Sequence, residues 1–242
     1  MKLSKDMNIL IVGLGLLGGS YAEGLKKQGF KVSAITKEES SVDFALEKGI
    51  IDYGTVKIEP ELIANADLTV FALYPHIFIE WIKENQQYFK SGAVITDVTG
   101  VKGCIVGKIQ SILREDVEFI AAHPMAGREV CGVENSTSEI FRGANYIVVP
   151  TEKNTPDAVE LCRDLGEKLG FYQVAELSIE MHDRMIGFLS QLTHCIAVSL
   201  MCCNSTPDLE KYTGDSFRDL TRIARINDEM WSELFLDNKN VL

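Results

Sequence analysis

The sequence has 242 residues, of which 46% are hydrophobic and 24% are charged. This length accommodates one full domain and a smaller one, and the apolar share is enough to bury a sizeable core. Its 24 Lys and Arg residues stand against 35 Asp and Glu, giving a net charge of -11, which argues against broad binding to nucleic acid or to an anionic membrane.

The cysteine pattern indicates neither a zinc site nor a disulfide framework, because the six cysteines form no CxxC pair. Unpaired thiols are typical of a reducing interior. We find no apolar run that approaches the roughly 20 residues needed to span a bilayer. We therefore expect a cytoplasmic protein without a metal, a nucleic-acid partner or a membrane partner, in which local features hold any anionic ligand.

The first predicted element is an apolar strand that begins near Met7 and runs into a GxGxxG sequence. In dinucleotide-binding folds the first glycine allows a sharp turn, the second lets the backbone approach a pyrophosphate, and the third lets the next helix pack on the sheet. The anion then lies on the helix N-terminus. A glycine-rich turn without a ligand is the alternative. The predicted cofactor contacts are Gly13, Leu14, Gly15, Leu16, Leu17 and Gly18.

The second predicted strand, residues 31–35, ends where NAD-specific sites place a carboxylate on the ribose 2′-OH, about 20 residues past the fingerprint. This chain has Thr36 and Lys37 there. A hydroxyl and a cation suit a 2′-phosphate, so NADP is favoured over NAD. Two alternatives remain open: Glu38 or Glu39 is the acid if the strand ends two residues later, or Lys37 is a solvated loop residue.

Strands and helices then alternate through five further predicted strands, at 68–73, 93–97, 118–122, 145–149 and 171–175. Alternation at this spacing predicts a doubly wound, mostly parallel sheet of the Rossmann type. Ligands of such sheets bind beyond the carboxyl ends of the strands. We therefore expect the nicotinamide crevice to be lined by Leu73, Tyr74 and Pro75.

His123 follows the predicted strand 118–122 and so lies at the same edge of the sheet. A histidine there can accept a hydroxyl proton as hydride leaves the same carbon, which is what NAD(P)-linked oxidation requires. Considered alone, an ordinary polar loop residue is the alternative.

Only helices are predicted from Ser178 onward. The segment 179–203 is apolar on most sides, which predicts a buried helix. One polar stripe interrupts it and needs partners of the kind that a ligand cleft supplies. Its members are Asp183, Gly187, Ser190, Gln191 and His194. We accordingly divide the chain into a dinucleotide-binding domain, 1–176, and a smaller all-helical domain, 177–242.

A later helix places Arg218, Arg222 and Arg225 on one face, by spacings of four and three. The alternative is a solvated basic face whose charges pair with Asp219 or Glu229. Such clustering in an acidic chain suggests a site for an anion.

Four motifs occur in an order that is typical of one family: GLGLLGGS from Gly13, HPMAG from His123, HD at His182 and FRDLTRIA from Phe217. With Trp231 beyond them, the chain resembles the prephenate/arogenate dehydrogenase family over nearly its whole length. HPMAG followed by HD and TRIA is far more specific than the glycine fingerprint. The resemblance implies a Rossmann domain followed by a helical domain that forms a homodimer, with the active cleft between them.

The resemblance also implies oxidative decarboxylation of prephenate or L-arogenate in tyrosine biosynthesis, with hydride passing to NAD(P)+. By motif, His123 takes or polarises the C4 hydroxyl proton, His194 orders the substrate, and Arg222 binds a substrate carboxylate bidentately. Relatives commonly carry a serine where this chain has Gly100, and the preceding Thr99 is the candidate to contact the cofactor in its place.

Two further departures from the family pattern concern Arg128, which replaces a small hydroxyl residue, and the region after Leu242, where the family continues with further helix. Arg128 could alter which substrate is held, and a missing helix would reduce the dimer interface and the cleft wall.

The runner-up activity is a β-hydroxyacid dehydrogenase, but the segment 179–203 lacks the lysine expected to act as its acid and base. A catalytically idle NAD(P)-binding module would not need His123, His194 and Arg222 together.

Overall fold

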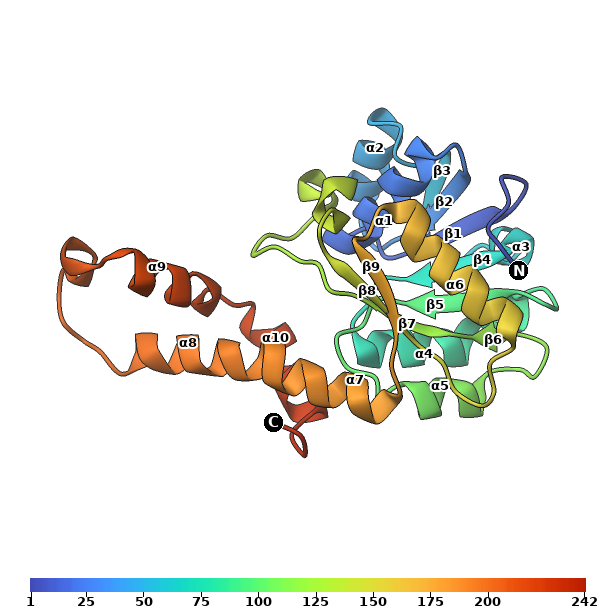
Figure 1. Cartoon of the computed structure of the whole chain (residues 1–242). Helices are drawn as coiled ribbons and strands as arrows, with labels where there is room; N and C mark the ends of the chain where they lie inside the picture. The colour runs from blue at the N-terminus through green and yellow to red at the C-terminus, as the bar shows by residue number, and fades with distance from the viewer.

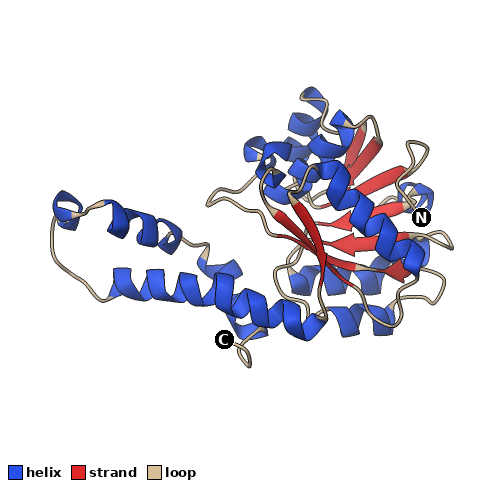
Figure 2. Cartoon of the chain, in the orientation of Figure 1, coloured by secondary structure: helices blue, strands red, loops and turns tan.

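The computed structural model describes all residues from 1 to 242. A six-stranded parallel sheet forms the centre of its larger part (Figure 1, Figure 2). In spatial order its strands are β3 (Tyr53–Thr55), β2 (Lys31–Ile35), β1 (Asn8–Val12), β4 (Leu68–Phe71), β5 (Val94–Asp97) and β6 (Glu118–Phe119). This arrangement, followed by helices alone, confirms the predicted fold class.

Helices cover both faces of the sheet because successive residues of each strand point to opposite sides. One core packs under α1 (Leu16–Lys27), α2 (Glu39–Glu47) and α6 (Pro156–Leu169). The other packs under α3 (Pro60–Asn65), α4 (Pro75–Asn85) and α5 (Val106–Ile112). Short 3₁₀ turns lie between these elements and in the later helical part, among them η1 (Gln86–Tyr88), η2 (Val133–Asn135), η3 (Ser138–Phe141) and η5 (Leu209–Tyr212).

The central strands end at one level. Val12 pairs with Ile35 and with Phe71, and Phe71 pairs with Asp97. The loops that follow β1, β2, β4 and β5 therefore meet along one edge of the sheet, which is the edge where ligands of this fold bind.

A second, three-stranded sheet differs from the expected single sheet. It contains β7 (Ala121–Pro124), β8 (Asn145–Val149) and β9 (Gln173–Glu176), and β7 pairs antiparallel to β8. The predicted strand 118–122 is therefore divided between the two sheets. The backbone N–H of Ile120 still donates to Ile95, but that of Ala122 donates to the side chain of Asp97, which ends the parallel ladder.

The remaining helices are α7 (Ile179–Ile186), a π-helical turn η4 (Gly187–Gln191), α8 (Leu192–Cys202), α9 (Asp215–Thr221), a 3₁₀ turn η6 (Arg222–Ala224) and α10 (Asp228–Asp237). α8 and α9 extend away from the body as a hairpin, and α10 returns to it (Figure 1). We call α8, α9 and the loop between them the arm.

The expectation of a buried helix at 179–203 is wrong. α7, η4 and α8 form one continuous helix of 24 residues. Its most apolar stretch has a mean hydropathy of 1.6, but only 22% of that stretch is buried. Its exposed side chains include Phe188, Leu189, Leu192, Ile196 and Leu200. By length and composition alone this helix is long and apolar enough to cross a membrane, contrary to the expectation that no run approaches that length. Helices that pack against protein pass the same test.

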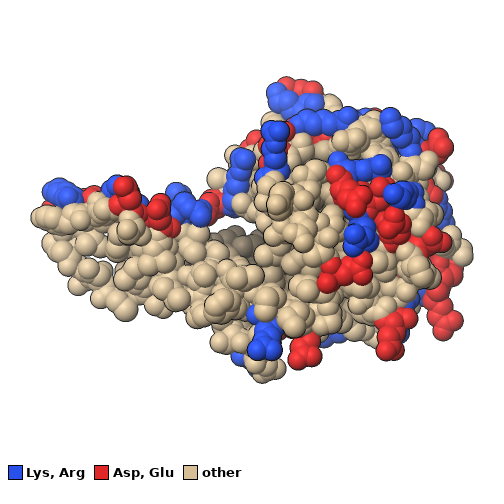
Figure 3. All heavy atoms as spheres, in the orientation of Figure 1, with Lys and Arg blue, Asp and Glu red and all other residues tan.

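The surface of the arm is unevenly charged (Figure 3). In the view shown, Lys, Arg, Asp and Glu side chains gather along α9, whereas the α8 side is almost free of them. An apolar helix face of this extent, joined to a well-packed body, is typical of a surface that a protein partner covers.

Candidate active site

The glycine loop after β1 is shaped by close backbone approaches. Gly13 has φ +97°, and a Cβ there would lie 2.5 Å from the carbonyl oxygen of Ala72. A Cβ on Gly18 would lie 1.8 Å from the carbonyl oxygen of Gly13, whereas one on Gly15 would meet nothing within 4 Å. No side chain caps the N-terminus of α1. The first-turn N–H groups of α1 therefore remain available to an anion over Gly15.

Thr36 and Lys37 lie beside this loop. Thr36 directly follows β2, and its Oγ1 accepts the backbone N–H of Leu14 at 3.3 Å. Lys37 is exposed, with its ammonium engaged in neither a hydrogen bond nor an ion pair. The Glu38 carboxylate accepts a hydrogen bond from Ser41 at 3.4 Å. The free cation nearest the end of β2 is thus Lys37.

The loop after β4 forms the next part of the edge. A Cβ on Gly13 would lie 2.9 Å from the side chain of Leu73, so Leu73 packs against the glycine loop. Pro75 is buried at the start of α4, and Tyr74 is exposed. His76 Nδ1 lies 2.7 Å from Glu233 Oε1. Because Glu233 belongs to α10, this contact brings the last helix to the edge of the sheet.

A buried ion pair fixes the loops that follow β5 and β6. The side chains of Asp97 and Lys102 are both fully buried, and Lys102 Nζ donates to Asp97 Oδ2 at 2.6 Å. The same ammonium donates to the carbonyl oxygen of Ala122 at 2.5 Å. Burial lowers the pKa of Lys102, and the Asp97 carboxylate opposes that effect. The pair joins β5 to β7 and so sets the position of His123, the next residue.

The Thr99 side chain is hydrogen-bonded to both members of this ion pair. Its hydroxyl donates to the Asp97 carboxylate and accepts from Lys102 Nζ at 3.2 Å, and the residue is 4% exposed. The Thr99 hydroxyl is therefore already hydrogen-bonded, so the backbone of this loop is the part that remains for contact with a cofactor. A Cβ on Gly100 would lie 3.2 Å from Leu234, so α10 packs directly on that loop.

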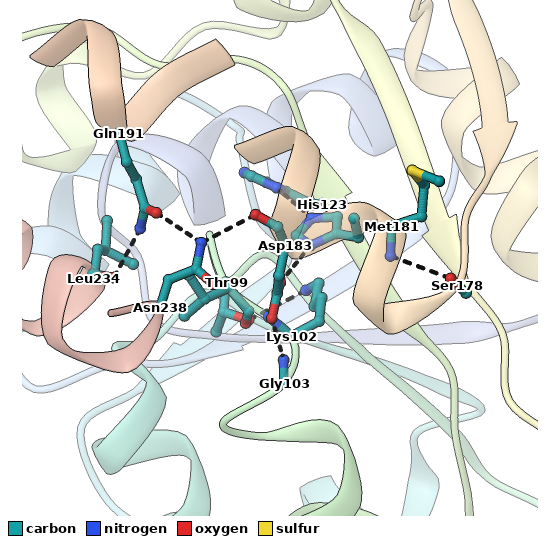
Figure 4. Close-up of polar contacts among 12 residues, drawn as sticks. Thr99, Lys102, Gly103, His123, Ser178, Met181, Asp183, Gln191, Leu234 and Asn238 are labelled. Carbon is teal, nitrogen blue, oxygen red and sulfur yellow. Dashed lines mark hydrogen bonds and ion pairs between the residues drawn. The ribbon is translucent and has the colours of Figure 1, made fainter. Parts of the chain in front are cut away.

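A line of hydrogen bonds runs from His123 into the helical part (Figure 4). His123 Nδ1 lies 2.9 Å from His182 Nε2, and His182 Nδ1 lies 2.7 Å from Asp183 Oδ1. The backbone N–H groups of Lys102 and Gly103 donate to the Asp183 carboxylate at 2.8 and 2.7 Å. The sequence predicted His123 as the candidate base and Asp183 as a member of the polar stripe, but it assigned His182 no role.

The environment of these groups favours neutral imidazoles and an ionised carboxylate. Burial lowers the pKa of His123, and His182 and the Lys102 ammonium act in the same direction. Burial also lowers the pKa of His182, although Asp183 opposes it. Burial raises the pKa of Asp183, but the hydrogen bonds it accepts from His182, Lys102 and Gly103 outweigh this and lower it.

The second ring nitrogen of His123 is available. Only His123 Nδ1 has a hydrogen-bond partner, and the sole fully buried side-chain polar atom without a partner is the hydroxyl oxygen of Tyr21. His123 Nε2 is therefore not enclosed and remains accessible. A neutral imidazole with an accessible lone pair can accept a proton from a bound hydroxyl group.

His194 and Arg222 lie on the helical side. The His194 ring stacks on Trp231 with centroids 3.7 Å apart, and its Nδ1 donates to the carbonyl oxygen of Ser190 at 2.8 Å. Arg222, in η6, donates from Nη1 to Glu129 Oε1 at 2.5 Å. Glu129 follows HPMAG, so Arg222 faces the body rather than pairing with Asp219 or Glu229.

Arg218 and Arg222 do not act as one basic face. Arg218 donates to Asp215 on its own helix, while Arg222 donates to Glu129 on the body. α8 packs against η6, which brings His194 and Arg222 to the same side of the molecule. His194 and Arg222 lie on helical elements that pack against each other.

His123 does not follow a strand end as predicted: it lies within β7 of the second sheet, opposite Ile147. The preceding residue, Ala122, donates its N–H to Asp97 at the end of β5, which keeps His123 near the carboxyl end of the parallel strands.

Part of the predicted polar stripe links α7 and η4 to α10. Asn238 Nδ2 donates to the carbonyl oxygen of Asp183 at 3.0 Å and to Gln191 Oε1 at 2.7 Å, and Gln191 Nε2 donates to Leu234 at 2.7 Å. The stripe correctly marked Asp183 and Gln191 as needing partners. Those partners lie in the protein itself (Figure 4).

Two family models match this chain. Residues 21–174 match "Prephenate dehydrogenase, nucleotide-binding domain" and residues 178–242 match "Prephenate dehydrogenase, dimerization domain". Among curated proteins, prephenate dehydrogenase of Bacillus subtilis is 30% identical over 99% of this chain and 66% of its own length. That of Lactococcus lactis is 29% identical over 96% of this chain and 65% of its own length. The chain thus spans about two thirds of the length of these relatives.

A solved structure matches over the whole chain. It is prephenate dehydrogenase from A. aeolicus in complex with hydroxyphenyl propionate and NAD+. The TM-score is 0.89 and the sequences are 34% identical, over 100% of this chain and 85% of that one.

Proposed function

This chain belongs to the prephenate dehydrogenase family, and from that premise we propose that it oxidises prephenate or L-arogenate with NAD(P)+, releasing CO2 and forming 4-hydroxyphenylpyruvate or L-tyrosine. The observation that carries the proposal is the accessible Nε2 of His123, an imidazole whose pKa is lowered by burial and whose strand is tied to the end of β5 through Asp97 and Lys102. This is the group that an alcohol oxidation needs beside a nicotinamide.

The residues present fit a dinucleotide. The crowding at Gly13 and Gly18 brings the uncapped start of α1 to open space over Gly15, where a pyrophosphate fits. Thr36 and the free ammonium of Lys37 at the end of β2 support a preference for the 2′-phosphate of NADP. When bound, the nicotinamide supplies the hydride acceptor. The solved A. aeolicus relative is in complex with NAD+, which supports a nicotinamide dinucleotide in general.

His123 is the proposed proton acceptor. As the C–H bond at the ring carbinol breaks, its Nε2 takes the hydroxyl proton and relieves the charge that develops on the oxygen. Loss of CO2 then makes the ring aromatic, so the overall step is strongly downhill and demands little basicity of the protein. A histidine whose pKa is lowered by burial suits this task, because it stays unprotonated at neutral pH.

Arg222 is the proposed anchor for a substrate carboxylate. Its guanidinium is 66% exposed and paired with Glu129, so it is oriented toward the body and accessible to a ligand. A planar guanidinium binds a carboxylate through two parallel hydrogen bonds. We propose that His194, stacked on Trp231, orders the substrate from the neighbouring helix.

Replacing Arg222 with alanine should therefore raise KM for the substrate by roughly 10- to 150-fold, the equivalent of about 1.5–3 kcal/mol for a hydrogen bond to a charged group. The reason is that the carboxylate loses its partner while the chemistry at His123 is untouched. Steady-state kinetics measure this, with Arg218→Ala as the matched control, because Arg218 pairs within its own helix. A KM within twofold of wild type would contradict this role and show that Arg222 is a solvated surface residue.

We also propose a homodimer formed through the apolar face of η4 and α8. Phe188 is 65% exposed and Ile196 48% exposed, and the matching family model describes this part as a dimerization domain. Light scattering after size exclusion should give about twice the chain mass of 26.9 kDa. A single-chain mass at micromolar concentration would contradict the proposal.

The assay that tests the function supplies prephenate and L-arogenate in turn, each with NADP+ and with NAD+, and follows absorbance at 340 nm. We expect absorbance to rise with at least one substrate, and faster with NADP+ than with NAD+. If neither substrate gives a signal while calorimetry shows that NADP+ binds, the chain is an idle nucleotide-binding module. A faster rate with NAD+ would contradict the proposal that Lys37 binds the 2′-phosphate of NADP.

A further inference from the structure

We propose that His182 and Asp183 are positioning residues that hold the proton of His123 on Nδ1, so that its Nε2 keeps an accessible lone pair. The three side chains form one line of hydrogen bonds from β7 into α7. The consequence for catalysis rests on the proposed function, but the direction of these hydrogen bonds does not, and it can be measured without turnover.

Asp183 sets the direction of the line because it can only accept. Its Oδ1 receives the backbone N–H of Lys102 at 2.8 Å, and its Oδ2 receives that of Gly103 at 2.7 Å. Both donors are fixed backbone groups in the loop after β5, so the carboxylate cannot turn or become a donor without losing one of them. Charge-assisted bonds of this kind are among the stronger ones in proteins.

The two histidines follow from that constraint. Since Asp183 Oδ1 is an acceptor, His182 Nδ1 carries a hydrogen and donates to it. A neutral imidazole has one donor and one acceptor, so His182 Nε2 is left as an acceptor. His123 Nδ1 must then donate to it across 2.9 Å, which leaves Nε2 of His123 as the unprotonated nitrogen.

The groups facing this line are of both signs. The Lys102 ammonium opposes protonation of either imidazole, whereas the Asp183 and Asp97 carboxylates favour a positive charge on His182. When His123 accepts a proton at Nε2, its Nδ1 hydrogen is already shared with His182 Nε2. The positive charge is thereby stabilised by an imidazole that itself donates to a carboxylate.

Nitrogen NMR tests the direction of the bonds in the full-length protein. The chain has only 4 histidines, so ¹⁵N-histidine labelling gives a spectrum in which each ring can be assigned by His→Gln substitution. We expect His123 and His182 both to carry hydrogen on Nδ1 only, with and without added NADP+. Hydrogen on Nε2 of His123, or on both nitrogens of His182, at neutral pH would overturn the proposal.

Asp183→Asn tests the consequence. Its amide keeps the shape of the carboxylate but gives up one of the two backbone N–H donors. With the NH2 group at the Oδ1 position, it donates to His182 Nδ1, which reverses both rings and places hydrogen on His123 Nε2. We expect kcat to fall by roughly 10- to 100-fold, which is part of the contribution of a general base, with KM for substrate and cofactor within about twofold. The same NMR experiment should show the two rings reversed.

Asn238→Ala is the matched control. It removes two hydrogen bonds from the same helix junction, one of them to the backbone of Asp183, without touching the carboxylate. If Asp183 only supports the helix, the two variants will lower kcat alike and leave the rings unchanged, which would overturn the proposal. Should Asp183→Asn not fold, the wild-type spectrum still decides.

Discussion

Replacing His123 with alanine should lower kcat by about two to four decades, the usual contribution of a positioned general base. The structure ties this imidazole to the loop after β5, through Ala122 and Lys102. Cofactor affinity should stay within about twofold, because the nucleotide is held by the glycine loop. Rapid-mixing kinetics and calorimetry measure the two quantities separately.

The pH dependence of the wild-type enzyme follows from the same environment. Burial lowers the pKa of His123 below its ordinary value of 6.5, so the base stays unprotonated as pH falls through neutrality. The acid limb of kcat/KM should therefore lie below pH 6.5.

His76→Ala is the control for His123→Ala, since His76 is exposed and contacts Glu233. Equal losses in the two variants, or a large loss of cofactor binding in His123→Ala, would show that His123 is misassigned.

Replacing Lys102 with methionine should lower the free energy of unfolding by about 3–5 kcal/mol, the cost of leaving one partner of a buried ion pair alone. Asp97 would then keep only its hydrogen bonds to Ala122 and Thr99, without a cation, in a site with no exposed surface. Denaturant titration measures the change as a shift of midpoint.

Two variants show whether the loss comes from the ion pair. Lys108→Met removes an exposed lysine from the neighbouring α5 and should change stability by no more than about 0.5 kcal/mol. The double change Asp97→Asn with Lys102→Met should be less destabilised than the sum of the single changes, because no charge is left unpaired. Additive losses would mean that the two side chains stabilise the fold independently.

The sequence predicts the nucleotide-binding half well because local patterns determine it. The predicted strand 31–35 matches β2 residue for residue, and 145–149 matches β8. Both are short apolar runs bounded by turn residues, and the glycines of the first loop have individual steric requirements that the structure displays. Patterns that depend on a few neighbouring residues can be recognised without knowing what lies across the sheet.

Features that depend on distant residues escape such reasoning. The parallel ladder of the predicted strand 118–122 ends because Asp97, from another strand, accepts the N–H of Ala122. The polar stripe on α7 and η4 was visible, but its partners Lys102 and Asn238 lie far away in the chain. Nothing local distinguishes Lys102, fully buried, from a surface lysine.

The apolar helix 179–202 shows a second limit. A helix that is apolar on most sides predicts burial, but the pattern does not say against what. Here most of it faces away from its own chain, and the dimer proposed above is the surface that would cover it. The candidate functional residues came mainly from the resemblance, since His123, His194 and Arg222 are unremarkable residues when taken singly.

The most direct test of the account follows one labelled atom. Prephenate or L-arogenate deuterated at the ring carbinol carbon is incubated with the protein and NADP+, and the reduced cofactor and the CO2 released are both quantified. We predict one CO2 for each reduced cofactor, with the deuterium in the nicotinamide ring. Bound NADP+ that acquires no deuterium from either substrate would contradict the assignment of this chain as a dehydrogenase.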